Sequence, residues 1–359
     1  RTPWFYLLLV GLLGLLAIGL YQIPIVQDYA YYYYANTKAK VFYYFNPPAA
    51  KAFNPSEQGT LPVNSAGTLT AMSPTQTPTP TNNPTSIITS TPTQTPVPTL
   101  TPTPIPGKVI LEGIKLERQG FNNCGPTTLA MNLSYWGWQG DQHVTEKVLK
   151  PRKEDRNVMP YEMLDYVTNE TELYGIVRYG GNLELVKKLV AAGFPVLIER
   201  GYMNASDGWM GHYGLIKGYD DAEQVVYIPD AYLGEIKISY EDITKDWDQF
   251  DDIYLVIYSI DRQDEVYNIL GLQLDEAYNK QYALDQVNER LAGLEGLDLF
   301  FAWYSRGSIQ VQMNDFYGAS QSFDKAFEIY QTLKEADRPW RITWYQTGPY
   351  YAYYYTGRY

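Results

Sequence analysis

Cysteine and histidine are scarce in this sequence of 359 residues, which contains only Cys124, His143 and His212. A single cysteine excludes an intrachain disulfide. These three residues are too few for a four-ligand zinc site built from cysteine and histidine. The phosphate-binding loops GxxxxGK(S/T) and GxGxxG are absent. We therefore expect neither a metal nor an organic cofactor.

Basic residues are also in the minority, with 28 Lys and Arg against 40 Asp and Glu and a formal net charge of −12. Nucleic acids and anionic lipid surfaces attract proteins with a basic face. The charge therefore argues against nucleic acid as a partner.

Charged residues are missing from the run Trp4–Tyr21, which is almost wholly apolar. A helix crosses a bilayer with about 20 apolar residues, and residues 23–26 can extend the run. The alternatives are a buried core helix and a cleaved signal peptide, but no Ala-x-Ala cleavage site of a signal peptide follows closely. The sequence predicts a single transmembrane anchor at residues 4–26. Its lipid partner is the bilayer, and the bulk of the chain is expected outside a bacterial cell.

Proline, threonine and serine dominate residues 73–106. Such a segment lacks the apolar surface that offsets the entropy of ordering, and its prolines favour extended polyproline II. Residues 27–107 are therefore predicted to be a juxtamembrane and disordered stalk. A folded domain is expected to begin at residue 108.

Residues 108–262 contain both helix-forming and strand-forming patterns, as in a fold that mixes helices and strands. Helical spacing predicts helices over residues 124–138, 159–168 and 183–192. Apolar runs between turn signals predict strands over residues 109–111, 114–116, 194–199, 212–219, 224–228 and 253–258. Helices followed by strands indicate an α+β domain.

The sharpest feature is the segment Gln119-Gly-Phe-Asn-Asn-Cys124-Gly-Pro. A thiol attacks a carbonyl as the thiolate, which the positive end of a helix dipole stabilises. Cys124 stands where the predicted helix begins. The Gln119 amide and the backbone N–H of Cys124 are candidate donors to an oxyanion.

A thiolate nucleophile also needs a base, and His212 stands between Gly211 and Gly214 at the start of a predicted strand. Asp230 ends the next apolar run. A carboxylate beside the imidazole would orient the ring and stabilise its charged form. His143 lies in a charged stretch and is expected at the surface.

The segment closely resembles the C39-like peptidases. Four features carry the resemblance: Gln119, the Asn-Cys-Gly-Pro run around Cys124, the Gly-His-Tyr motif around His212, and Asp230. That family is a branch of the papain-like cysteine peptidase fold, and the resemblance spans residues 108–262. It implies that Cys is the nucleophile, His the general base, Asp the orienting group and Gln the oxyanion donor. It also implies an α+β papain-like domain that acts on a peptide or protein substrate.

Residues 263–359 carry a helical pattern without strand signals. Six residues match the spacing of one tetratricopeptide repeat: Trp303, Gly307, Phe316, Ala319, Phe323 and Ala326. Arg306, Gln310 and Gln331 depart from that pattern. We expect a tetratricopeptide-like solenoid fragment that is truncated at residue 359, and a concave helical surface of this kind can hold a protein partner.

Two functions follow from these features. The first is a cysteine peptidase that hydrolyses peptide or amide bonds outside the membrane through Cys124, His212, Asp230 and Gln119. The alternative is a catalytically inactive C39-like and tetratricopeptide-like module that binds peptides or proteins.

Overall fold

A computed structural model describes residues 3–23, eight isolated positions between 26 and 45, and residues 105–358 except 153, 154, 156 and 205–207. The chain divides into two units, of which one comprises Arg1–Pro55 with Ile105–Tyr359 and the other Ser56–Pro104. The second unit, and with it most of the predicted Thr/Pro-rich stalk, lies outside the described residues.

Helix α1 covers Pro3–Tyr21, inside the predicted membrane anchor. A turn at Gln22 ends it, so the expected extension to Val26 does not join the helix. Its 19 residues rise about 28 Å, whereas the hydrocarbon core measures about 30 Å. No helix in the described part of the chain is long and apolar enough to cross a membrane. The predicted anchor at residues 4–26, its bilayer partner and the single-pass membrane localisation are therefore wrong.

Residues 105–258 contain two four-stranded sheets in which every pairing is antiparallel. The first has the order β1-β5-β6-β7, with bounds Lys108–Ile110, Gly218–Asp220, Val225–Asp230 and Gly234–Ser239. The second has the order β2-β8-β3-β4, with bounds Tyr174–Arg178, Tyr254–Tyr258, Val196–Asn204 and Gly208–Ile216.

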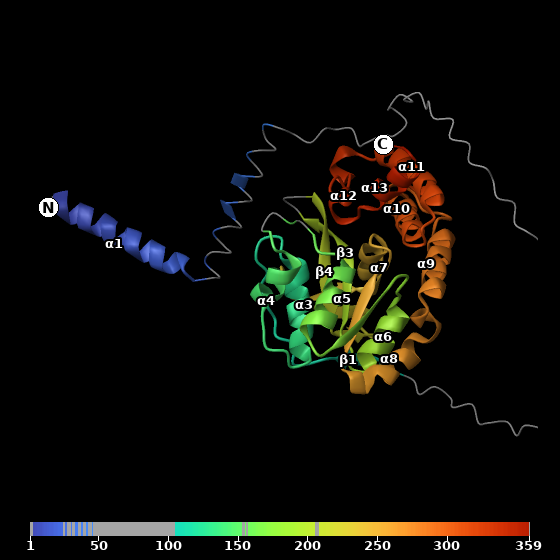
Figure 1. Ribbon diagram of the computed structural model, residues 1–359, viewed down its shortest axis with the longest axis horizontal. Helices are drawn as coiled ribbons and strands as arrows, with labels where there is room; N and C mark the ends of the chain where they lie inside the picture. The colour runs from blue at the N-terminus through green and yellow to red at the C-terminus, as the bar shows by residue number, and fades with distance from the viewer. Residues whose placement is uncertain are drawn as a thin grey trace, which may run out of the picture. The chain divides into compact units, whose positions relative to one another are not determined.

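Helices surround these sheets and continue beyond them (Figure 1). Those of the first part of the domain are α3 Cys124–Tyr135, α4 Gln142–Leu149, α5 Pro160–Glu170, α6 Leu183–Ala191 and α7 Tyr240–Asp248. The later helices are α8 Gln263–Leu270, α9 Glu276–Arg290, α10 Gly296–Gln312, α11 Phe316–Thr332, α12 Ile342–Tyr345 and α13 Gly348–Tyr355. Short 3₁₀ turns cover Ile260–Arg262, Gly271–Leu274 and Glu335–Asp337.

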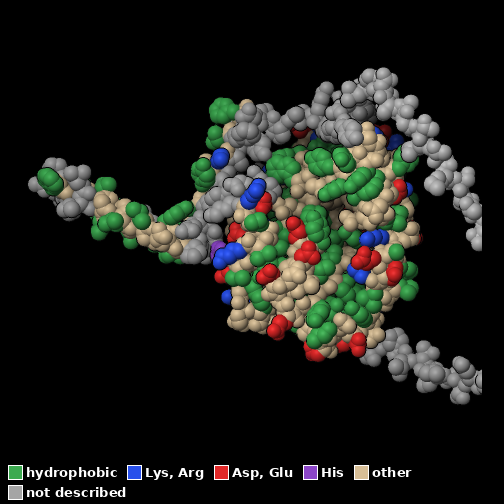
Figure 2. Space-filling model, in the orientation of Figure 1, with side chains coloured by type: hydrophobic (Ala, Val, Ile, Leu, Met, Phe, Trp, Pro, Cys, Tyr) green, Lys and Arg blue, Asp and Glu red, His purple; other side chains and the backbone are tan. Residues whose placement is uncertain are grey.

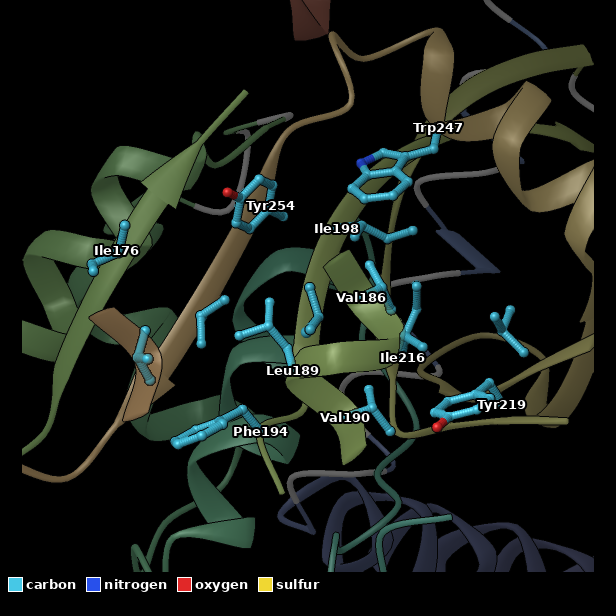
Figure 3. Packing of buried hydrophobic residues seen from close by; sticks show 14 of the residues in the cluster. Ile176, Val186, Leu189, Val190, Phe194, Ile198, Ile216, Tyr219, Trp247 and Tyr254 are labelled. Carbon is cyan, nitrogen blue, oxygen red and sulfur yellow. The ribbon is translucent and has the colours of Figure 1, made fainter. Parts of the chain in front are cut away.

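Both faces of the second sheet are buried, because successive side chains of a strand point to opposite sides. On β3, Val196 and Ile198 pack with α6, α7 and α8 in one core. Figure 3 shows Ile198 in this core together with Leu189 of α6 and Trp247 of α7. Leu197 faces the opposite core, formed with α3 and α5. The helix that begins with Cys124 is therefore held against the sheet that carries His212.

Most of the predicted elements are confirmed. The expected strands at residues 194–199, 224–228 and 253–258 correspond to β3, β6 and β8, and the expected helices correspond to α3, α5 and α6. The predicted strand at residues 114–116 is wrong, since those residues form no strand. The predicted run 212–219 is interrupted at Lys217, where β4 gives way to β5.

The C-terminal helices pack directly on the sheet-containing part. Figure 1 shows α10, α11, α12 and α13, in orange to red, grouped beside β3 and β4. Trp209 of β4 and Phe250 share a core with Phe301 and Phe323. At the pair α10–α11, a Cβ on Gly307 would lie 2.7 Å from the Phe323 ring, so glycine permits this close crossing. The tetratricopeptide-like assignment stays a prediction, as do the boundaries at 108–262 and 263–359.

We expect Phe323→Ala to destabilise the folded state by about 3 to 5 kcal/mol, because the fully buried ring leaves a cavity. Tyr317→Ala is the matched control on the same helix, since Tyr317 is 69% exposed, and it should change stability by less than about 0.5 kcal/mol. Urea unfolding followed by circular dichroism measures both. Equal losses for the two variants would contradict the shared core.

Candidate active site

Cys124 is the first residue of α3, at the end of the helix where backbone N–H groups have no helical acceptor. Its successor explains why the helix can sit so close to its neighbours. A Cβ on Gly125 would lie 2.8 Å from Cε of Met163 and 3.3 Å from Val158, so a larger residue would push the helix away. Pro126 occupies the first turn, where its missing N–H costs no hydrogen bond.

The loop before Cys124 is fixed by Gln142, the first residue of α4, which is 4% exposed. Its Oε1 accepts hydrogen bonds from Gly120 N at 2.7 Å, Asn123 Nδ2 at 2.9 Å and Thr127 Oγ1 at 3.1 Å. Its Nε2 donates to the Arg118 carbonyl at 2.6 Å. One buried amide thus binds residues on both sides of Cys124.

Lys150 is the second support of this loop, and it brings charge. The residue is 4% exposed, and its Nζ donates to the Asn122 carbonyl at 2.6 Å. Asn122 has a positive φ of 53°, a conformation that asparagine tolerates better than most residues. The ammonium group thus lies under the turn that precedes Cys124.

His212 and Asp230 meet although they belong to different sheets, His212 on β4 and Asp230 at the end of β6. The His212 Nε2 lies 3.0 Å from Asp230 Oδ1 and 2.9 Å from Oδ2. Because Nε2 faces the carboxylate, Nδ1 is the ring nitrogen left for the thiol of Cys124, to which the imidazole is hydrogen-bonded. The structure therefore brings these three side chains together in the predicted order.

Asp230 is fully buried and its charge is compensated from several directions. The N–H groups of Tyr232 and Leu233 each donate to Oδ1 at 2.8 Å. Arg200, 2% exposed, donates from Nη2 to Oδ2 at 3.3 Å and from Nη1 to Asp246 at 3.1 Å. Arg200 also stands opposite His212 in the β3–β4 register. The carboxylate is thereby held in one orientation.

The protonation equilibria of the cluster favour charged groups. Burial alone would raise the pKa of the Cys124 thiol, but the hydrogen bond and charge of His212, with the charge of Lys150, lower that pKa overall. Burial opposes the imidazolium, yet Asp230 and Cys124 raise the pKa of His212 to about 9. Burial also opposes ionisation of Asp230, whose pKa is nevertheless lowered by the His212 hydrogen bond and charge. These shifts favour a thiolate–imidazolium–carboxylate array over the neutral forms of the three groups.

The backbone of Gln119 lies close to this cluster. Its N–H donates to the carbonyl of Ala231, the residue after Asp230, at 2.9 Å. Its side-chain Oε1 is buried and has no hydrogen-bond partner within the described residues. Within the described residues, this oxygen therefore does not tie the side chain to another part of the structure. Its role as an oxyanion donor stays a prediction.

Sequence reasoning missed Arg200, Gln142 and Lys150. All three are polar residues that are more than nine-tenths buried. The sequence around each of them carries no motif that would mark it as part of a site. His143 lies on α4 with its side chain 34% exposed, and its Nδ1 lies 3.8 Å from the carboxylate of Glu146. Among the described residues, no group of three or more His, Cys, Asp or Glu side chains is arranged to hold a metal ion.

Residues 111–259 match the model of the Peptidase_C39 like family. This match supports the papain-like α+β fold that the sequence predicts for the domain. No curated protein matches the chain.

Three solved structures are similar to this chain. One is described as a C39-like peptidase from Bacillus anthracis, with 19% identity and a TM-score of 0.34 over 42% of this chain and 98% of that one. A double glycine motif protease from an AMS/PCAT transporter, solved with the leader peptide, has 22% identity and a TM-score of 0.29 over 42% and 89%. Xylellain, a cysteine protease from Xylella fastidiosa, has 13% identity and a TM-score of 0.34 over 44% and 87%.

We expect Lys150→Met to raise the pKa of the Cys124 thiol, because the variant removes a positive charge that stabilises the thiolate. The rate of iodoacetamide alkylation against pH measures this, and Cys124 is the only cysteine in the chain. Lys147→Met is the control, since Lys147 is an exposed residue of α4, the helix that ends just before Lys150. An unchanged alkylation profile in Lys150→Met would show that this ammonium does not act on the thiol.

Proposed function

We propose that this protein is a cysteine peptidase that hydrolyses peptide or amide bonds, with Cys124 as nucleophile, His212 as general acid and base, and Asp230 as the orienting carboxylate. The observation that carries the proposal is the contact of His212 with both partners at once. Its Nε2 lies 2.9 Å from Asp230 Oδ2, while its ring is hydrogen-bonded to the Cys124 thiol.

The first half of the reaction forms a thioester. The Cys124 thiolate attacks the carbonyl carbon of the scissile bond, and the carbonyl electrons move onto oxygen. The imidazolium of His212 gives its proton to the departing amine nitrogen as the C–N bond breaks. The amine product leaves, and His212 remains neutral.

The second half restores the enzyme. Neutral His212 removes a proton from water, the resulting hydroxide adds to the thioester carbon, and the C–S bond breaks to give a carboxylic acid. The thiolate and imidazolium are then regenerated together. Asp230 keeps the ring oriented throughout, because its carboxylate is itself held by Arg200 and two backbone N–H groups.

The developing negative charge on the carbonyl oxygen needs donors. The backbone N–H of Cys124 at the start of α3 and the amide of Gln119 are the groups we assign to this role. The peptide that occupied the cleft would thus meet a helix N-terminus on one side and a side-chain amide on the other. This assignment extends the sequence prediction and is supported by the position of Gln119 next to Ala231.

The variant Cys124→Ala tests the function most simply. We expect a peptide library to contain substrates that the wild-type chain cleaves, and we expect the variant to show no cleavage above background, because no other thiol is present. Mass spectrometry of the products and a circular dichroism melt of both proteins measure cleavage and folding. Cleavage by a folded Cys124→Ala protein at the wild-type rate would refute the mechanism. Peptide binding by a wild-type protein that cleaves nothing would favour the binding-module alternative.

The variant Asp230→Asn tests the pH dependence. The pKa of His212 is raised to about 9, so the imidazolium that protonates the leaving amine is lost as pH rises through that value. Removing the carboxylate lowers this pKa and moves the alkaline limb of kcat/KM to lower pH. We also expect kcat/KM to fall by about tenfold or more. Asp285→Asn, a change at an exposed position of α9, is the control. An alkaline limb that stays in place would argue against His212 as the acid.

A further inference from the structure

A cavity of about 360 Å³ lies between the sheet-containing part of the chain and the C-terminal helices. Glu199 of β3 and Asp251, which precedes β8, line it from the first part. Tyr345, Gly348 and Tyr351 line it from the second part. The volume falls within the usual range of small-ligand pockets, about 300 to 1,000 Å³.

This cavity adjoins the proposed nucleophile. Burial is the largest cause of the raised pKa values of Glu199 and Tyr345. The charge of Cys124 raises both pKa values further. A Cβ on Gly211, the residue before His212, would lie 2.8 Å from the Tyr345 ring. The cavity wall at Tyr345 therefore lies against the residue that precedes the proposed base.

Two buried carboxyl groups lack full compensation there. Glu199 is 4% exposed and Asp251 is 9% exposed, yet Glu199 Oε1 and Asp251 Oδ1 have no hydrogen-bond partner among the described residues. A buried carboxylate oxygen without a partner is costly unless a cation or a donor reaches it. Burial accordingly raises the pKa of Glu199 well above its usual value and that of Asp251 to about 7.

Within the described part of the chain, no cation is paired with either of these two oxygens. No lysine or arginine is found among the described residues that line the cavity. Arg290 of α9 is the cation whose charge acts on Asp251, but its Nη1 is paired with Asp248 and with Asp252, the latter at 2.8 Å. Arg200, next to Glu199 in sequence, is paired with Asp230 and Asp246.

The remaining walls suit the stem of a long cationic side chain. The rings of Phe250, Tyr345 and Tyr351 line the cavity. Aromatic faces attract a cation through their quadrupole, and they also pack against a methylene chain. A cavity that is lined by aromatic rings and by two carboxyl groups is the complement of lysine or arginine.

We propose that this cavity is a specificity pocket that binds a lysine or arginine side chain of the peptide substrate close to the scissile bond. The proposal rests on the peptidase function proposed above and adds the chemical class of substrate. It also gives the C-terminal helices a direct part in substrate selection, because they form one wall of the pocket.

The test compares kcat/KM for pairs of peptides that differ only at one position near the cleaved bond, carrying lysine in one and norleucine in the other. Charge-assisted contacts with buried carboxylates lead us to expect a preference for lysine of about tenfold or more in the wild-type chain. Glu199→Gln should reduce this ratio, and so should Asp251→Asn, which keeps a residue that tolerates the positive φ of 59°. Glu172→Gln, at an exposed position, is the control that should keep the ratio.

Two results separate failure of the pocket from failure of the function. Cleavage with equal kcat/KM for lysine and norleucine peptides at every position, or a lysine preference unchanged in both cavity variants, would overturn the pocket and leave the peptidase intact. If no peptide is cleaved, the peptidase function fails, and thermal stabilisation by Nα-acetyl-lysine amide then tests the cavity alone. Stabilisation by that amide but not by Nα-acetyl-norleucine amide, lost in Glu199→Gln and Asp251→Asn, would support a cation site, and equal effects of both amides would refute it.

Discussion

The buried contact between His212 and Asp230 is the interaction on which the rest of this site depends. A carboxylate with no solvent exposure is tolerable only when charges and donors around it replace water. Asp230 receives the imidazole, the guanidinium of Arg200 and two backbone N–H groups, which fill both of its oxygens. Because these partners come from β3, β4 and the turn after β6, the same contacts join the two sheets. The geometry that orients the imidazole is therefore also a structural requirement of the domain.

The position of Cys124 depends on a second set of buried polar groups, which bind the turn that precedes it. Gln142 binds Gly120, Asn123 and Thr127 with one oxygen, and Lys150 holds the carbonyl of Asn122. The site is thus built from α3 and α4 on one side and from the middle of β4 and the end of β6 on the other. The C-terminal helices extend it, since Tyr345 packs against Gly211. In Figure 2 hydrophobic side chains gather over the region where Figure 1 labels α12 and α13, and Tyr350, Tyr351 and Tyr354 are among the exposed ones.

The sequence predicted the parts of this arrangement that leave a local signal. A cysteine before a helix, a histidine between glycines and an aspartate after an apolar run can each be recognised from near neighbours. Arg200, Gln142 and Lys150 leave no such signal, because their partners lie far away in the sequence and each stands in an ordinary element.

The strand β7 was missed although exposed Glu235 and Lys237 alternate along it with the half-buried Ile236 and Ile238, a pattern typical of a strand. The predicted membrane anchor failed because composition indicated a span longer than the helix, which ends at Tyr21. The core that Trp209 shares with Phe323 could not be predicted. The apolar pattern of each segment shows that it is buried, but it does not show which distant segment it packs against.

Nitrogen NMR of the imidazole rings tests the central ion pair most directly, because the chain contains only two histidines. Spectra of ¹⁵N-histidine-labelled protein across the pH range, assigned with a His143→Gln variant, report the protonation of both nitrogens of His212. The structure predicts an imidazolium at neutral pH that loses its proton near pH 9. A neutral His212 ring at pH 7, with one nitrogen unprotonated, would contradict the proposed thiolate–imidazolium–carboxylate array.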